Sequence, residues 1–406
     1  MESGPILFDP SRSLSGSIPI GKSSSIKKEV RFMRHGIVQR VWMGILVVST
    51  SSLVAAQSPN GATLPADKVK QRTEMVQRGV EYLSKHGQAE DGTFSLQAGP
   101  GVTALVLTGM LRNDVPLDHP ALQKGLKALE GFVKPDGGIY GNGRLKNYET
   151  CVSVLCFSEA NRVAKNGRYN KLLKEAQVFL KSMQYADAEV PEYGGVGYAG
   201  KGRPDLSNTS YLLEALQALD TSSSDPAVQS ALVFVSRCQN LKSEHNTNPL
   251  VAKINDGGFF YTLPNEKDLE SSDSNTLVSG LRSYGSMTYS GLKSMIYAGL
   301  GPDDKRVKAA TEWLSKHYTL TENPGMGKAG LYYYFHTFAA ALQATGKNEF
   351  QDKDGKTHAW KVELIDALSA LQSSDGAWKN DNRQWFEDDK NLATAFALMS
   401  LSYCAK

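Results

Sequence analysis

The sequence predicts an all-α protein, a closed (α/α)6 toroid in which an inner ring of six helices lies inside an outer ring of six. Three observations lead to this fold class: a unit that recurs six times, an amphipathic first helix in the unit, and a second helix that is apolar on more than one face. The composition agrees, because 41% hydrophobic and 21% charged residues are ordinary for a soluble globular chain of 406 residues.

The first helix of the unit is clearest at residues 169–184. Its apolar residues fall at i, i+1, i+4, i+7, i+8 and i+11, which is one stripe along a helix; they are Leu172, Leu173, Ala176, Phe179, Leu180 and Met183. The same kind of helix recurs elsewhere, since residues 80–86 read VEYLSKH and residues 311–317 read TEWLSKH.

A glycine turn that carries an apolar residue follows each first helix. Asp-Gly sequences supply the positive φ that a sharp reversal needs. The six turns are Asp91-Gly92-Thr93-Phe94, Asp136-Gly137-Gly138-Ile139, Tyr193-Gly194-Gly195-Val196, Asp256-Gly257-Gly258-Phe259, a looser one from Gly325 to Tyr332, and Asp375-Gly376-Ala377-Trp378.

The second helix of each unit starts near a threonine and is apolar nearly all round, which indicates burial on all sides. The six threonines are Thr103, Thr150, Thr209, Thr288, Thr337 and Thr394. An open helical solenoid is the alternative arrangement, but its repeats keep a tighter period and its end units carry polar faces. Here the threonines are 47 to 79 residues apart and the last helix stays apolar to Tyr403, so we expect closure.

The N-terminal residues 1–56 are expected to form an extension with a secretory signal peptide, and residues 57–406 the toroid domain. Residues 41–56 are a short apolar run that follows basic residues and ends in a small-residue cleavage site before Gln57. The run is shorter than the roughly 20 residues that span a bilayer, so we expect export to the periplasm or outside the cell. An uncleaved segment would instead be an N-terminal anchor, and Met33 is a second candidate start.

The net charge of +3 belongs to this N-terminal segment. Residues 1–56 hold seven of the 45 Lys and Arg and three of the 42 Asp and Glu, so the rest carries 38 basic and 39 acidic residues. We therefore expect no nucleic-acid partner.

Several of the glycine turns resemble a known repeat. Gln372-Ser-Ser-Asp-Gly376-Ala-Trp378 resembles the QW motif of squalene and oxidosqualene cyclases, and Gln88-Ala-Glu-Asp-Gly92-Thr-Phe94 repeats its spacing. Residues 70–406 therefore resemble the prenyltransferase and squalene-cyclase repeat superfamily. The resemblance implies the toroid, but it does not imply one activity, because cyclases, protein prenyltransferase β subunits and thioester domains share the architecture.

The catalytic acid of that superfamily is altered here. Squalene–hopene cyclases protonate an alkene with the middle acid of Asp-x-Asp-Asp-Thr, and the matching place reads Asp205-Leu206-Ser207-Asn208-Thr209. Only Asp205 remains as a candidate catalytic acid. The alternative is that Asp205, Ser207 and Asn208 cap the helix that follows.

No metal or cofactor is expected. The Asp-x-Cys of the zinc-binding prenyltransferase subunits is absent, and so are a thioester motif and a glycine-rich phosphate loop. Cys151, Cys156 and Cys404 fall in apolar helices and Cys238 ends a first helix, which predicts buried free thiols.

Aromatic residues near the starts of the second helices are the candidate ligand contacts. In a toroid these ends ring one mouth of the central cavity, where aromatic rings hold a lipid or a cation, although core packing is an alternative. The candidate ligand-binding residues are Tyr211, Tyr289, Tyr332, His336 and Trp378. Helical spacing puts Tyr332, Phe335 and His336 on one face, so we expect Tyr332 and His336 to border the largest pocket, near Asp205 and Tyr211.

These features predict an exported protein that binds a hydrophobic small molecule or an extended polymer in its central cavity without the cyclase reaction. The alternative is an active enzyme, either a divergent terpenoid cyclase that uses Asp205 or a secreted polysaccharide lyase or hydrolase. The latter would use an acidic rim formed by Asp205, Asp256, Glu387, Asp388 and Asp389, for which a solvated surface is the competing interpretation.

Overall fold

A computed structural model describes residues 64–200, 202–264 and 281–405. These residues belong to one compact unit, Pro59–Lys406. The predicted signal segment at 41–56 lies outside the described residues, so the division into an extension and a toroid domain stays a prediction.

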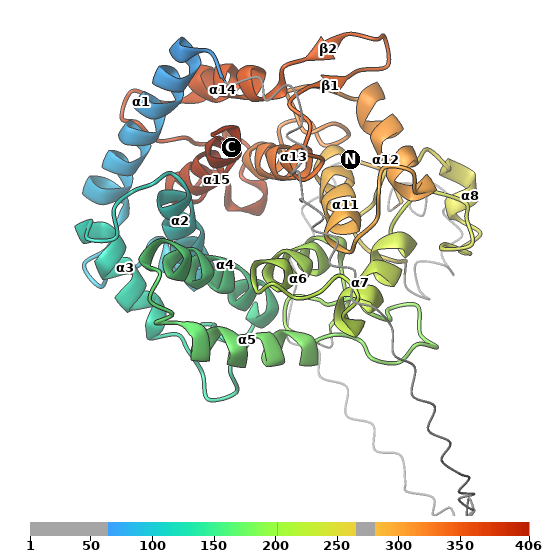
Figure 1. Cartoon of the computed structure of the whole chain (residues 1–406), viewed down its shortest axis with the longest axis horizontal. Coiled ribbons are helices and arrows are strands. Elements are labelled where there is room, and N and C mark those ends of the chain that lie inside the picture. Colours follow the sequence, from blue (N-terminus) through green and yellow to red (C-terminus); the bar gives the residue numbers. More distant parts are fainter. Residues whose placement is uncertain (1–63, 201, 265–280, 406) are drawn as a thin grey trace, which may run out of the picture. The chain divides into compact units, whose positions relative to one another are not determined.

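Six helices form an inner ring, and each is preceded in the chain by a helix of an outer ring (Figure 1). The inner helices are α2 (Pro100–Arg112), α4 (Lys146–Ala164), α6 (Leu206–Ala218), α11 (Gly285–Tyr297), α13 (Leu331–Ala344) and α15 (Lys390–Cys404). The outer helices are α1 (Ala66–Tyr82), α3 (Pro120–Glu130), α5 (Asn170–Ser182), α7 (Pro226–Arg237), α12 (Lys305–Lys316) and α14 (Trp360–Leu371).

The ring is closed. Each inner helix packs against the next one along the chain, and α15 returns to pack against α2, while α14 packs against α1 in the outer ring. The predicted closed (α/α)6 toroid is therefore confirmed, and the open solenoid is excluded for the described residues.

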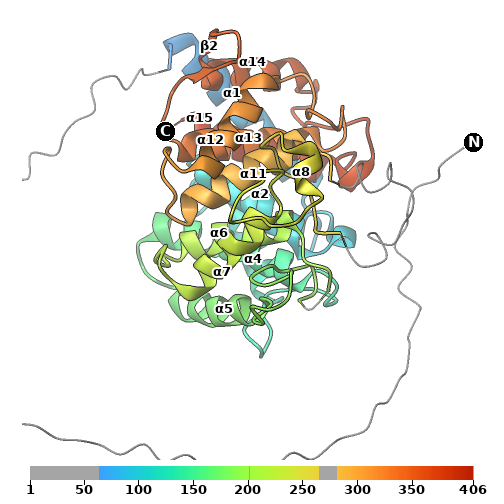
Figure 2. The same cartoon turned by 90° about the vertical axis from the view of Figure 1, so that its right-hand side faces the viewer.

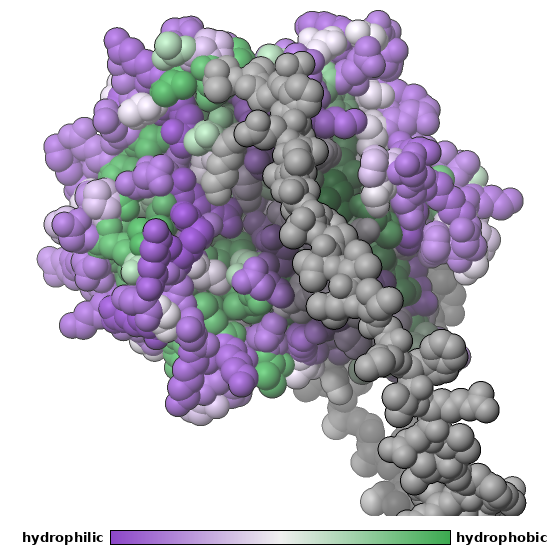
Figure 3. Space-filling model, viewed as in Figure 1, coloured by the Kyte–Doolittle hydropathy of each residue, from purple (hydrophilic) through white to green (hydrophobic). Residues whose placement is uncertain are grey.

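Burial follows the apolar patterns in the sequence. Every residue from Pro100 to Leu111 in α2 is buried, as expected for a helix of an inner ring. The outer helix α5 buries one stripe, Leu173, Ala176, Phe179 and Leu180. The face drawn in Figure 3 agrees, because hydrophilic residues dominate its periphery.

The unit threonines join each glycine turn to the inner helix that follows. The Thr103 hydroxyl accepts the N–H of Phe94 at 2.9 Å, and Thr394 does the same for Trp378 at 3.1 Å. Thr150, Thr209 and Thr288 repeat this bond with Ile139, Val196 and Phe259. The fifth unit differs, since the Thr337 hydroxyl bonds within its own helix to Tyr334.

A glutamine joins each of four turns to the outer helix of the next unit. The Gln372 amide donates to the carbonyls of Gly376, in its own turn, and Met75, in α1. Gln88, Gln184 and Gln239 make the same pair of bonds, to Gly92 and Ala121, to Gly194 and Ala227, and to Gly257 and Arg306. The glutamine of the QW-like motif thus has a structural role, and in the last unit it ties the end of the chain to its first outer helix.

The remaining elements are short. A π-helical turn (Leu83–Gly87) extends α1, and 3-10 turns cover Leu96–Ala98 and Gln384–Phe386. Helix α8 (Val251–Ile254) lies between α7 and α11, and β1 (Phe350–Gln351) pairs antiparallel with β2 (Thr357–His358) between α13 and α14. Figure 2 shows the two ends of the inner ring on opposite sides: the chain end after α15 lies on one side, and the loop before α15 on the other.

Candidate functional site

Asp205 lies at the N-terminal end of α6 and caps that helix. One oxygen of its carboxylate accepts the Asn208 N–H at 2.8 Å and the Ser207 hydroxyl at 2.6 Å, and the other accepts the Asn208 side-chain amide at 2.8 Å. The side chain of Tyr261 is also hydrogen-bonded to it. Burial raises the pKa of Asp205 above its ordinary value, although these donors work in the opposite direction. The capping arrangement that the sequence suggested is therefore present, and both carboxylate oxygens are engaged.

An aromatic layer fills the axis of the inner ring one turn below this end. The ring of Tyr211 in α6 lies 5.3 Å from that of Tyr148 in α4 and 6.3 Å from that of Tyr333 in α13. Tyr333 in turn lies 5.7 Å from Phe396 in α15. These four residues are called the aromatic layer below. The helix α13 thus turns Tyr333, rather than the expected Tyr332, toward Tyr211.

Tyr198 extends the aromatic layer to the surface. Its ring packs edge-on against Tyr148 at 6.3 Å and is 40% exposed. Below it, Tyr211 is 5% exposed, and its hydroxyl has no hydrogen-bond partner among the described residues. An apolar surface with a polar atom left unpaired is the kind of place that a ligand completes.

Three of the predicted ligand contacts lie between helices instead of on the axis. Tyr289 packs against Tyr334 and Phe338, at 5.8 and 5.1 Å between ring centres. Tyr332 is 1% exposed and donates its hydroxyl to the Lys379 carbonyl, and Trp378 is fully buried and donates to the Leu368 carbonyl. The structure brings Tyr211 and His336 to the axis, and a ligand-binding role for all five residues stays a prediction.

A buried ion pair lies on the axis directly beneath the aromatic layer. Lys293 of α11 donates to Glu214 of α6 at 2.5 Å, and each side chain is no more than 3% exposed. Burial alone would raise the pKa of Glu214, but Lys293 and Arg112 outweigh it and lower the pKa to about 2. Glu214 therefore stays ionised inside the protein.

The ion pair belongs to a network with one residue from each inner helix. The Arg112 guanidinium donates to the Tyr403 hydroxyl at 2.8 Å and to Glu159 at 2.9 Å. The Tyr403 hydroxyl lies 3.4 Å from Glu214 and closes the connection. The axial network is Arg112, Glu159, Glu214, Lys293, His336 and Tyr403, from α2, α4, α6, α11, α13 and α15.

His336 is an uncharged member of the axial network and joins it by ring contacts alone. It is fully buried, its ring lies 5.8 Å from Phe396 and 6.0 Å from Tyr403, and neither ring nitrogen has a hydrogen-bond partner among the described residues. Burial lowers its pKa to about 3, with Lys293 and Arg112 acting in the same direction against Glu214. The imidazole is therefore neutral at physiological pH.

The sequence analysis missed this network. Glu214 and Lys293 stand in otherwise apolar inner helices, in TSYLLEALQA and SMTYSGLKSM. Lone charges of opposite sign on helices predicted to be buried were the available signal, because a buried charge needs a partner.

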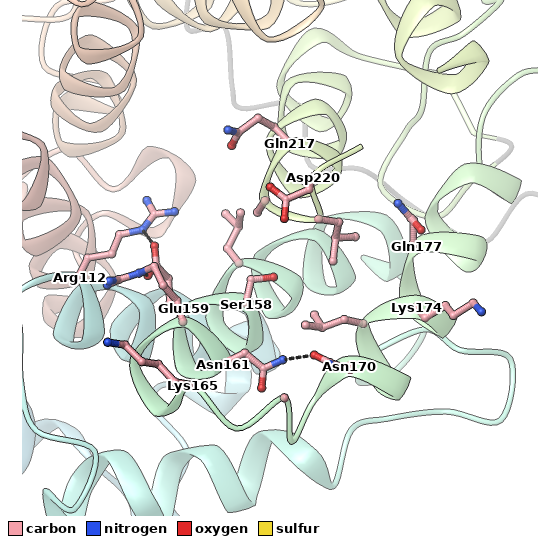
Figure 4. Close-up of a pocket in the computed structure, with 16 residues that line it drawn as sticks. Arg112, Ser158, Glu159, Asn161, Lys165, Asn170, Lys174, Gln177, Gln217 and Asp220 are labelled. Carbon is pink, nitrogen blue, oxygen red and sulfur yellow. Dashed lines mark hydrogen bonds and ion pairs between the residues drawn. The ribbon is translucent and has the colours of Figure 1, made fainter. Parts of the chain in front are cut away.

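A pocket of about 760 Å³ opens at the opposite end of the inner ring, between α4, α5 and α6 (Figure 4). Arg112 and Glu159 lie at one side of it, Lys174 and Gln177 at another, and Asp220 follows the end of α6. Leucines alternate with these polar groups, and no aromatic residue lines it. None of the predicted ligand-binding residues borders this pocket.

Three of the acidic residues proposed as a catalytic rim each accept hydrogen bonds from a separate set of donors. Glu387 is 1% exposed and accepts the N–H groups of Tyr332 and Tyr333 at the start of α13. Asp389 caps α15, and Asp256 accepts from Gly258, Ser283 and Trp313. These three carboxylates satisfy local donors, as structural acids do, and among the described residues Asp388 forms only a 3.7 Å ion pair with Arg383.

Within the described ranges, no group of three or more His, Cys, Asp or Glu is placed to hold a metal ion. The helices of these ranges also include none with the length and apolar character of a membrane span. The four cysteines are buried and free, as their sequence positions predicted.

This protein is similar to known proteins in its fold. No protein-family model matches the sequence, and no curated protein does. Among solved structures, a family 76 glycoside hydrolase from a Bacteroides thetaiotaomicron strain is similar, with a TM-score of 0.52 and 11% identity over 82% of this chain and 78% of that one. An alpha-amylase from Clostridium perfringens has a TM-score of 0.50 and 13% identity over 82% and 97%.

A type II terpene cyclase from Scytonema is also similar, with a TM-score of 0.47 and 13% identity over 83% of this chain and 98% of that one. At such identities a likeness speaks for the fold and not for the activity. The chain therefore has the α/α toroid fold that its resemblance to the prenyltransferase and squalene-cyclase repeat superfamily implied.

Proposed function

We propose that this protein is exported and binds a hydrophobic or extended ligand without cyclase chemistry. The binding site would lie at the end of the inner ring that carries the aromatic layer, which is called the aromatic end below. The observation that carries the proposal is the aromatic layer, with Tyr198 exposed above it and the Tyr211 hydroxyl without a hydrogen-bond partner among the described residues. Aromatic rings that carry few polar atoms suit a ligand that is mostly apolar on its faces.

The state of Asp205 argues against the cyclase alternative. A carboxyl group that protonates an alkene must carry a proton and direct it at the substrate. Asp205 instead accepts hydrogen bonds on both oxygens, from Ser207 and Asn208. Both oxygens are thus engaged in capping α6, and neither is free to direct a proton at a substrate, although burial raises the pKa of the carboxyl group.

The glycan-enzyme alternative ranks second. One toroid neighbour is named as a family 76 glycoside hydrolase and another as an alpha-amylase, and the pocket between α4, α5 and α6 is lined by Glu159 and Asp220. Burial raises the pKa of Glu159, but Arg112 and Arg162 lower it below its ordinary value. A general acid needs the opposite shift.

Binding and turnover of the same ligands separate these possibilities. We expect squalene or a polysaccharide to bind without forming a product. Tyr198→Ala should weaken binding by about 1 kcal/mol, because a stacked ring is lost, and Tyr198→Phe should retain most of it. Val178→Ala removes a residue that is 66% exposed on α5 and is the control.

Product formation that disappears in Asp205→Asn would contradict the proposal and favour the cyclase. Release of sugars that disappears in Glu159→Gln would favour the glycan enzyme. Equal affinities of wild type and Tyr198→Ala would reject the aromatic end as the binding site.

Export has its own test. The apolar run 41–56 and the change in charge after it support cleavage before Gln57. We expect N-terminal sequencing of the native protein to begin near Gln57. An intact N-terminus in the cytosolic fraction would refute export.

A further inference from the structure

We propose that Trp385 and Phe386 form a stacking surface for a neutral, extended carbohydrate at the aromatic end of the ring. The inference rests on the proposed function and gives the extended ligand a chemical class. The two side chains are 51% and 65% exposed, so they contribute less to the core than any buried aromatic residue of this chain.

The backbone at these two residues is unfavourable. Trp385 has φ +56° and Phe386 φ +62°, in the left-handed region that bulky residues avoid. They are the only neighbouring pair of non-glycine residues with positive φ in the described ranges. Unfavourable backbone conformations persist where the surrounding structure holds them, and they gather at functional sites.

Buried groups behind the pair hold it in this conformation. The Glu387 carboxylate accepts the Tyr333 N–H at 2.7 Å and the Asn380 amide at 2.7 Å, and the Asp389 N–H donates to the Phe386 carbonyl. The Trp385 ring lies against Gly330, where a Cβ atom would come within 2.8 Å of it. The pair is thus presented by a rigid support.

The same contacts connect the pair to the aromatic layer. Glu387 follows Phe386 directly and fixes the backbone of Tyr333, whose ring contacts Tyr211. From Tyr211 the aromatic contacts continue through Tyr148 to the exposed Tyr198. The exposed ring of Tyr198 therefore lies at one end of this aromatic set, and Glu387 joins the exposed pair to its other end through the Tyr333 backbone, an arrangement that suits a ligand longer than a single sugar ring.

The charged residues near Trp385 and Phe386 in the chain indicate which class of ligand the pair binds. Residues 379–390 contain three basic and four acidic side chains, so this surface has no positive excess to attract nucleic acid or anionic lipid. Asn382 and Gln384 precede the pair in the chain, and their side-chain amides can hydrogen-bond hydroxyl groups. The C–H faces of pyranose rings pack on the negative faces of aromatic rings, which an exposed Trp supplies.

Oligosaccharide titrations on the full-length expressed protein test the inference. The probes are cellohexaose, maltoheptaose and a soluble mannan, with squalene and phosphatidylcholine vesicles as the apolar comparison. We expect at least one carbohydrate to bind and Trp385→Ala and Phe386→Ala each to weaken it by about two- to tenfold. Val178→Ala should leave the affinity unchanged.

Phe386→Gly separates binding from stability. Glycine accepts the positive φ without strain, so we expect an unchanged or higher melting temperature together with weaker carbohydrate binding. Carbohydrate affinity that is unchanged in both Trp385→Ala and Phe386→Gly would overturn the inference, while loss in Tyr198→Ala would still support the proposed function. Binding of squalene or vesicles alone would overturn the carbohydrate assignment only, and no binding of any probe would overturn both.

Discussion

At the scale of single residues, the interior holds charges that the aromatic layer covers. Glu214 and Lys293 form a buried ion pair, and removal of Lys293 leaves Glu214 with only the longer contacts to the Tyr403 hydroxyl at 3.4 Å and Arg112 at 4.0 Å. Such a loss costs about 3–5 kcal/mol, whereas replacing both by apolar residues is often close to neutral. Replacing one member of the pair therefore lowers the stability more than replacing both.

We therefore expect Lys293→Met to lower the free energy of unfolding by about 3–5 kcal/mol. The double variant with Glu214→Met should recover most of this loss. Lys316→Met breaks the exposed pair with Glu312 and should cost under about 1 kcal/mol. Chemical denaturation of the four proteins measures these differences, and a double variant no more stable than Lys293→Met would contradict the account.

The neutral His336 makes the fold sensitive to acid. Its pKa falls from 6.5 in the unfolded chain to about 3 in the fold, so the unfolded state binds the extra proton first. Stability is therefore complete above pH 6.5 and is lost as the pH falls toward 3. Glu214, with a pKa lowered from 4.5 to about 2, adds a loss of the same sign below pH 4.5.

We expect the free energy of unfolding to fall between pH 7 and pH 5 by roughly 1–2 kcal/mol through His336. His336→Phe should remove most of this fall, because it has no proton to gain. His86→Gln, at an exposed histidine, is the control. Parallel pH dependence of wild type and His336→Phe would show that other groups control the acid response.

At the scale of elements, the glycine turns hold the outer ring together. Gly376 has φ +89°, and a Cβ there would lie 2.5 Å from the Arg78 carbonyl oxygen in α1. Gly346 has φ +69° with nothing within 4 Å of the same position. The two glycines share a backbone conformation and differ in the space around them.

Gly346→Ala should therefore cost about 1–2 kcal/mol for its backbone alone. Gly376→Ala should cost several kcal/mol, because it also pushes α1 away from the turn. Thermal melts of both variants test the difference, and similar losses would mean that α1 moves without penalty.

The helical hairpins were predictable because their periodicity and turns are local. Gln184 and Gln239 were missed, since they lie 10 and 18 residues before their partner glycines instead of four. The orientation of α13 was also missed: its sequence places Tyr332 and Tyr333 on different faces but does not say which face meets the axis. The contacts among the six inner helices decide which face of α13 meets the axis. These contacts join residues that are far apart in the sequence, so a local pattern does not reveal them.

At the scale of the whole unit, closure changes how the repeats depend on one another. In an open array each repeat contacts its neighbours only, so end units open by themselves. Here α1 contacts α14 and α15, and its Arg72 donates to the Leu401 carbonyl and the Asn113 side chain. No hairpin of the ring is terminal, and the axial network draws on all six.

The buried cysteines can report on this dependence. Cys151 and Cys156 lie in α4, Cys238 follows α7, and Cys404 ends α15, so the four thiols sample different parts of the ring. We expect them to become reactive at the same denaturant concentration at which the fluorescence of the buried tryptophans changes, because opening one hairpin exposes its neighbours on both sides. Thiol labelling read by mass spectrometry at each cysteine measures this. Labelling of Cys151 or Cys238 while the fluorescence is still native would show that hairpins open one at a time, and the closed ring would then not unfold as a unit.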